Sequence, residues 1–111
     1  MNTFELMDKA RNAVEGESIL GYKETNSHAC YMLVGVMKPG EKGRRLKPGA
    51  GHEELVLTTK GSFAVTGFIK GTLAEGFAIH LAGEQECLLE NISGADAIYV
   101  LSGGHSESGH H

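Results

Sequence analysis

Histidine and glutamate side chains recur in the strand-like segments of this chain, and both residue types can transfer protons or bind metal ions near neutral pH. His52 and Glu54 lie two positions apart. Because strand side chains alternate between two faces, this spacing places both on one face, together with Val56 and Thr58. The pair is the first candidate for catalysis, with His52 and Glu54 acting as acid and base.

Two further side chains of these types follow in a later segment. Glu86 shares a strand face with Leu88 and Glu90, and it remains a candidate for the inward face. His80 alternates with apolar neighbours and faces away from the core if those neighbours pack inside it. We therefore rank His80 below His52 as a site residue.

Residues 40–47, GEKGRRLK, carry two adjacent guanidinium groups, Arg44 and Arg45. Guanidinium pairs in a bidentate manner with carboxylate or phosphate, so these two arginines are candidates for binding an anionic substrate near the mouth of a barrel. The alternative is an ordinary solvated hairpin loop.

The elements that position these side chains follow from composition and turn spacing. A chain of 111 residues fits one domain. With 41% apolar and 22% charged residues, it can form a core without the support of disulfides or a bound metal. The 16 glycines, against 2 prolines, fall between short apolar runs, which is typical of strands joined by many turns. The composition therefore predicts an all-β fold.

Three regions are expected along the chain. The first region is residues 1–16. It should form a helix over residues 2–14, because Phe4, Met7, Ala10 and Val14 share one helical face, and Gly16 can end it. Residues 17–102 predict one antiparallel barrel with no second helix. Residues 103–111 hold three of the six histidines between glycines and serines and predict a flexible tail, whose end could come from a purification tag.

Several classes of partner and location are disfavoured. The formal charge of −4 and a single short basic cluster at residues 42–47 argue against nucleic-acid binding. No signal peptide pattern and no 18-residue apolar run occur, so we expect a cytoplasmic protein without a membrane partner. Cys30 and Cys87 lie in apolar runs and are expected to be reduced, buried thiols.

Two segments together resemble the cupin family. Glu54 precedes Gly61 by six intervening residues and follows a PGAG turn, as in the first cupin motif. Residues 76–91, GFAIHLAGEQECLLEN, are similar to the second motif, with Glu86 where the family usually has a histidine. The resemblance covers about residues 37–101. It implies a cupin-like antiparallel β-barrel, a jelly roll or double-stranded β-helix, with one short N-terminal helix.

The resemblance also implies a metal site, although its ligands depart from the family pattern. The two usual histidines of the first motif would fall near Pro48 and Ala50. His52 could replace one of them, so the implied ligands are His52, Glu54 and Glu86, with His80 as a fourth. Oxygen-rich ligation favours Mn²⁺ or Fe²⁺ over Zn²⁺. A metal with open positions would support an oxygenase, isomerase or cyclase that acts on a small polar or carbonyl compound.

Two alternatives to a metalloenzyme stay open. A barrel without metal could bind a small polar ligand beside His52, Glu54 and Glu86. The protein could instead be a non-catalytic ligand sensor or dimerisation module with a degenerate metal site, its barrel filled by side chains. We expect a homodimer, since Leu55 and Leu57 would face outward and cupins commonly pair their barrels.

Overall fold

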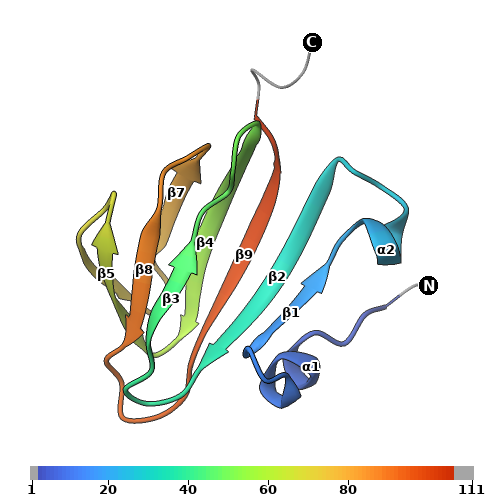
Figure 1. Cartoon of the computed structure of the whole chain (residues 1–111). Coiled ribbons are helices and arrows are strands. Elements are labelled where there is room, and N and C mark those ends of the chain that lie inside the picture. Colours follow the sequence, from blue (N-terminus) through green and yellow to red (C-terminus); the bar gives the residue numbers. More distant parts are fainter. Residues whose placement is uncertain (1–2, 107–111) are drawn as a thin grey trace.

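The computed structural model describes residues 3–106 (Figure 1). This part of the chain holds two short helices and nine strands. The helices are α1 (Met7–Asn12) and α2 (Tyr22–Thr25). The strands are β1 (Glu17–Leu20), β2 (Cys30–Met37), β3 (Lys42–Leu46), β4 (His52–Lys60), β5 (Ser62–Gly67), β6 (Gly71–Ala74), β7 (Ala78–Ala82), β8 (Cys87–Asn91) and β9 (Ala97–His105).

The strands form two antiparallel sheets that face each other. One sheet has the order β1-β2-β9-β4-β7 and the other has the order β3-β8-β5-β6. The space between them is filled by apolar side chains from both sheets, including Val56, Phe63, Leu81, Leu89 and Tyr99. The all-β prediction is confirmed. Within residues 3–106 each sheet keeps two edge strands, so the expected barrel is open rather than a closed ring.

Alternation along β4 decides which side chains enter the core. Glu54, Val56 and Thr58 are buried, while Leu55 and Leu57 face outward with 55% and 39% of their surface exposed. This agrees with the orientation that the sequence predicted for the strand. The inward face of β4 therefore carries Glu54, and its outward face carries two exposed leucines.

Helix α1 is much shorter than the predicted helix over residues 2–14. Only Ala10 is fully buried, against Val34, Val36 and Ile98 on the outer face of the larger sheet. Phe4 and Val14 are exposed, and Asn2 lies outside the described residues. An isolated short helix is marginal in water, so the helical turns persist only where the sheet supports them.

Helix α2 shows that the expectation of no second helix within residues 17–102 is wrong. Glu24 Oε1 accepts a hydrogen bond from the Gly21 N–H at 2.7 Å, and Thr25 Oγ1 donates to the Gly21 carbonyl at 3.0 Å. These local bonds satisfy backbone groups that a strand would have paired elsewhere. The helix ends at Asn26, which adopts the left-handed conformation with a φ of 58°.

Strand β9 extends through His105, so residues 103–105 do not belong to a flexible tail. Figure 1 shows β9 (red) between β2 and β4 in the middle of the larger sheet. A Cβ at Gly103 would lie 2.5 Å from the Tyr31 ring, so only glycine fits there. His110 and His111 lie outside the described residues.

The two cysteines also differ from each other. Cys87 is buried as expected, whereas Cys30 is exposed, because it begins β2 on the outward face. Neither helix of the described chain has the length and apolar character needed to span a membrane.

Candidate functional site

A pocket of about 750 Å³ lies over the outer face of the larger sheet. Its floor is a row of side chains that crosses all five strands in register. From β1 to β7 the row consists of Leu20, Met32, Ser102, Leu55 and His80. Met32 and Leu55 are exposed, with 40% and 55% of their surface accessible, because within residues 3–106 no element covers this half of the sheet as α1 covers the other.

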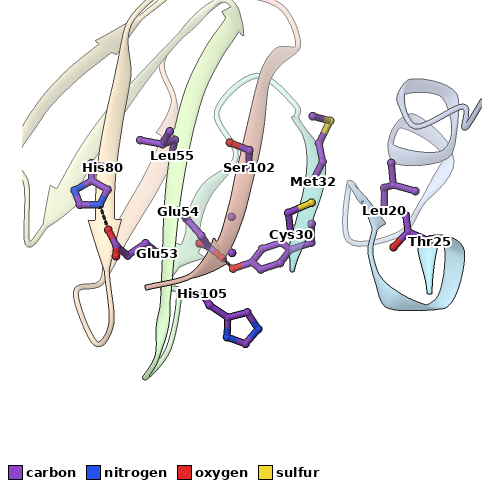
Figure 2. Close-up of a pocket in the computed structure, with 13 residues that line it drawn as sticks. Leu20, Thr25, Cys30, Met32, Glu53, Glu54, Leu55, His80, Ser102 and His105 are labelled. Carbon is purple, nitrogen blue, oxygen red and sulfur yellow. Dashed lines mark hydrogen bonds and ion pairs between the residues drawn. The ribbon is translucent and has the colours of Figure 1, made fainter. Parts of the chain in front are cut away.

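A second row of lining residues lies one pair of residues nearer the strand ends. Gly104 of β9 lies in register between Cys30 of β2 and Glu53 of β4. A Cβ at Gly104 would lie 2.7 Å from the Ala29 carbonyl oxygen, so backbone, not open space, lies over the middle of this row. Thr25 of α2 and His105 also line the pocket, as do three residues whose strand positions face inward: Tyr31, Glu54 and Gly103. Figure 2 shows Leu20 and Thr25 on one side of the pocket and His80 with Glu53 on the other.

Glu53 and His80 form the polar pair of the pocket. His80 Nε2 donates a hydrogen bond to Glu53 Oε1 at 2.8 Å, and both side chains remain partly exposed (Figure 2). The two residues come from neighbouring strands β4 and β7, whose pairing places His80 opposite Leu55. A carboxylate that holds an imidazole in this manner fixes the orientation of the ring.

Tyr31 and Glu54 form a second polar pair, on the inward side of the sheet. Glu54 is only 8% exposed, and Tyr31 Oη donates to its Oε2 at 2.5 Å. Burial raises the pKa of the Tyr31 hydroxyl well above its ordinary value, and the hydrogen bond and charge of Glu54 raise it further. The hydroxyl therefore stays protonated and serves Glu54 as a donor. Sequence reasoning missed Tyr31, because its position opposite Gly103 follows from the pairing of β2 with β9, which the sequence alone does not give.

His52 lies near this inward pair but outside the described pocket lining. Its ring centroid is 6.2 Å from that of Tyr31 and 5.2 Å from that of His105. His52 Nδ1 lies 3.2 Å from the Ala50 carbonyl oxygen. The predicted pair His52 and Glu54 thus shares one strand face, and Tyr31 contacts both residues.

The inward orientation expected for Glu86 is wrong. In β8, Cys87 and Leu89 are buried while Leu88 and Glu90 are exposed, so Glu86 falls on the outer face. There its carboxylate forms an ion pair with Arg45. The inward position at this point of the chain belongs to Cys87, which packs in the apolar core.

The four implied metal ligands are therefore not brought together. Glu54 is inward and bonded to Tyr31, Glu86 is outward on the other sheet, and His80 is outward and bonded to Glu53. In residues 3–106, no three His, Cys, Asp or Glu side chains are close enough to hold a metal ion. The donor set does not fit a cupin metal centre.

The predicted substrate-binding arginines also have different surroundings than expected. The expected loop is strand β3, and the Arg44 side chain is directed inward with 11% of its surface exposed. Arg44 Nη1 donates to Tyr99 Oη at 3.0 Å, and Arg44 Nη2 donates to Glu41 Oε2 at 2.7 Å. Glu17 lies 3.6 Å away as a second ionic partner. Arg44 thus joins β3 to the larger sheet and does not line the pocket.

Arg45 borders a second, shallower depression of about 400 Å³, together with Lys47, Gly49 and Glu84. Lys47 Nζ lies 2.8 Å from Glu84 Oε2, and Arg45 is paired with Glu86. Each cation has an acidic partner, and surface pairs of this kind contribute little to stability. Arg45 as a substrate ligand stays a prediction.

Several solved structures have a similar fold, and some of them are named as cupins. An oxalate oxidase gives a TM-score of 0.69 at 16% identity, covering 85% of this chain and 53% of that chain. The cupin domain of Cnp3 from Schizosaccharomyces pombe gives 0.66 at 13%, covering 81% and 64%. A cupin-superfamily sugar phosphate isomerase from Silicibacter pomeroyi gives 0.61 at 18%, covering 81% and 60%.

These likenesses establish that the chain has the cupin fold. The chain spans about 53 to 64% of the length of these three structures. No family model matches the sequence, and no curated protein is significantly similar to it.

Proposed function

We propose that this cupin-fold protein binds a small molecule in the pocket over the outer face of its larger sheet. The observation that carries the proposal is the pocket itself, about 750 Å³ with an apolar floor and a few polar groups at its sides. Small-molecule sites in proteins usually measure about 300 to 1,000 Å³ and have this mixture of surfaces. Binding without a resident metal is favoured, because Glu86 and His80 lie on other surfaces than the pair His52 and Glu54.

The similar oxalate oxidase and sugar phosphate isomerase are enzymes, which keeps an oxygenase, isomerase or cyclase activity open as the finer hypothesis. One fold hosts many chemistries, so this likeness carries less weight than the site. The polar pairs Glu53–His80 and Tyr31–Glu54 offer acid and base groups for such an activity. The cytoplasmic location stays a prediction.

The test is a small-molecule screen followed by backbone amide NMR. We expect compounds that bind to shift the amides of residues 30–32, 53–55 and 102–105, which line the pocket. Leu55→Arg should abolish these shifts by placing a charge on the apolar floor. Leu88→Arg is the matched control, because Leu88 is a strand leucine of similar exposure, 41%, on the other sheet. Shifts elsewhere, or equal binding by both variants, would contradict the proposal.

Self-association is a second candidate function, favoured by the same outer face. Met32, Leu55 and Leu57 expose apolar surface together there, and a second copy of the chain is the proposed occupant. Light scattering should then give twice the monomer mass of 11.8 kDa, and Leu57→Lys should return the protein to a monomer. A monomer at all concentrations would refute the homodimer. A dimer whose mass falls as a compound binds would show that the two occupants compete.

A further inference from the structure

The charges around the outer-face pocket are of one sign. Its lining includes Glu53, whose carboxylate is on the outer face, and Glu54, whose carboxylate is directed to the inward side, whereas no lysine or arginine belongs to the lining found in residues 3–106. The basic side chains there are the imidazoles of His80 and His105, which are weak bases. Arg45 of β3 and Lys47 of the turn that follows it lie at the other depression. An anionic ligand would therefore meet the carboxylate of Glu53 in this pocket without a permanent cation to offset it.

Glu53 is the carboxylate that a ligand can reach. Its side chain is about one third exposed, and its hydrogen bond with His80 uses only Oε1. A carboxylate accepts several hydrogen bonds through two oxygens, so Glu53 can accept another donor while it holds His80. Glu54, by contrast, is buried and bonded to Tyr31, so it adds negative potential without direct contact.

The apolar floor sets the size of the rest of the ligand. Glu53 lies on β4, and Met32 lies on β2, two strands away across β9. Neighbouring strands are about 4.8 Å apart, so the distance from the carboxylate to the Met32 side of the floor is roughly 10 Å. Leu55 and Ser102 lie between them. The floor fits one aromatic ring or a short aliphatic chain.

Given these charges and distances, we propose that the ligand of this pocket is a small organic cation, an amine with an apolar body. The ammonium group donates to Glu53, and the apolar body lies over Leu55 and Met32. Charge-assisted hydrogen bonds of this type are stronger than neutral ones, particularly beside an apolar surface. This inference rests on the proposed binding function and names the chemical class of its ligand.

The experiment compares three probes with one skeleton: 3-phenylpropylamine, 3-phenylpropan-1-ol and 3-phenylpropanoate. Affinity is measured by calorimetry, and occupancy by the rate at which Cys30 in the pocket is alkylated. We expect the amine to bind best, the alcohol roughly tenfold more weakly and the carboxylate weakest of all. Glu53→Gln should weaken the amine roughly tenfold and leave the alcohol unchanged. Glu90→Gln, the same change on the exposed face of β8, should alter neither.

The outcomes separate a failure of the cation inference from a failure of the proposed binding function. If the alcohol or the carboxylate binds as well as the amine, the cation inference is overturned while the pocket stands. If Glu53→Gln weakens all three probes equally, Glu53 does not select for charge and the inference also fails. If none of the probes binds or slows alkylation of Cys30, and Leu55→Arg behaves like the native protein, the proposed function is overturned as well.

Discussion

Replacing Tyr31 by phenylalanine removes the hydroxyl that donates to Glu54. Glu54 is 8% exposed and the hydrogen bond is 2.5 Å long, so water can replace the lost donor only in part. Hydrogen bonds to charged groups contribute about 1.5 to 3 kcal/mol, and neutral ones about 0.5 to 1.5 kcal/mol. Tyr31→Phe should therefore lower the free energy of unfolding by about 2 kcal/mol. In a Glu54→Gln background the same change should cost roughly 1 kcal/mol, because the acceptor is then neutral.

The assay is urea unfolding at pH 7 of the native protein, the two single variants and the double variant. We expect a coupling energy near 1 kcal/mol, from the difference between the charged and the neutral hydrogen bond. Equal costs of Tyr31→Phe in both backgrounds would refute the reasoning, because the hydroxyl would then not interact with the charge on Glu54. A total cost below about 0.5 kcal/mol would mean that water replaces the donor and that Glu54 is more accessible than its burial indicates.

Three further outcomes test other parts of the structure. A thiol reagent should modify only Cys30 in the native protein and both cysteines after unfolding, because Cys87 is buried; rapid labelling of two native thiols would contradict this. Gly35→Ala should cost about 3 kcal/mol or more in urea unfolding, since its Cβ would lie 2.1 Å from Tyr99 Cζ, whereas Gly94→Ala, with no atom within 4 Å, should be neutral. Burial raises the pKa of Tyr99 above its ordinary value of 10.0, so its stabilising contribution is complete below pH 10 and is lost as pH rises through the folded-state pKa. Unfolding curves from pH 8 to 12 should show this alkaline loss, and a flat profile would argue against a buried hydroxyl.

Much of the fold could be predicted from local patterns. Glycine turns and short apolar runs were sufficient for an all-β chain, and alternation in β4 gave the correct faces for Glu54, Leu55 and Leu57. The length of α1 and the role of residues 103–105 could not be predicted, because both depend on a sheet that lies far away in sequence. In the sequence Gly103 and Gly104 look like linker glycines. In the structure a Cβ at Gly103 would collide with the Tyr31 ring, and a Cβ at Gly104 would collide with the Ala29 carbonyl oxygen.

The candidate site was predicted less well, for two physical reasons. In β8 the two faces carry similar apolar residues, Leu88 outward and Leu89 inward, so hydrophobicity did not decide the direction of Glu86. The pocket floor, moreover, is one residue from each of five strands, and their order in the sheet is not their order in the chain. Single-sequence patterns do not give this register. In this register His80 lies opposite Leu55, two positions from Glu53 on the same face of β4, so Glu53 and His80 are diagonal neighbours.

The central position of β9 has a consequence for how the protein is made. Its partners β2 and β4 begin 67 and 45 residues earlier (97 − 30 and 97 − 52). While the ribosome is still synthesising residues 97–105, the neighbouring edges of β2 and β4 have no strand between them. Unpaired edges are templates for aggregation, and pairings between distant residues form slowly. We therefore expect the larger sheet to assemble only after β9 has emerged, so that the nascent chain depends on chaperones more than its small size would indicate.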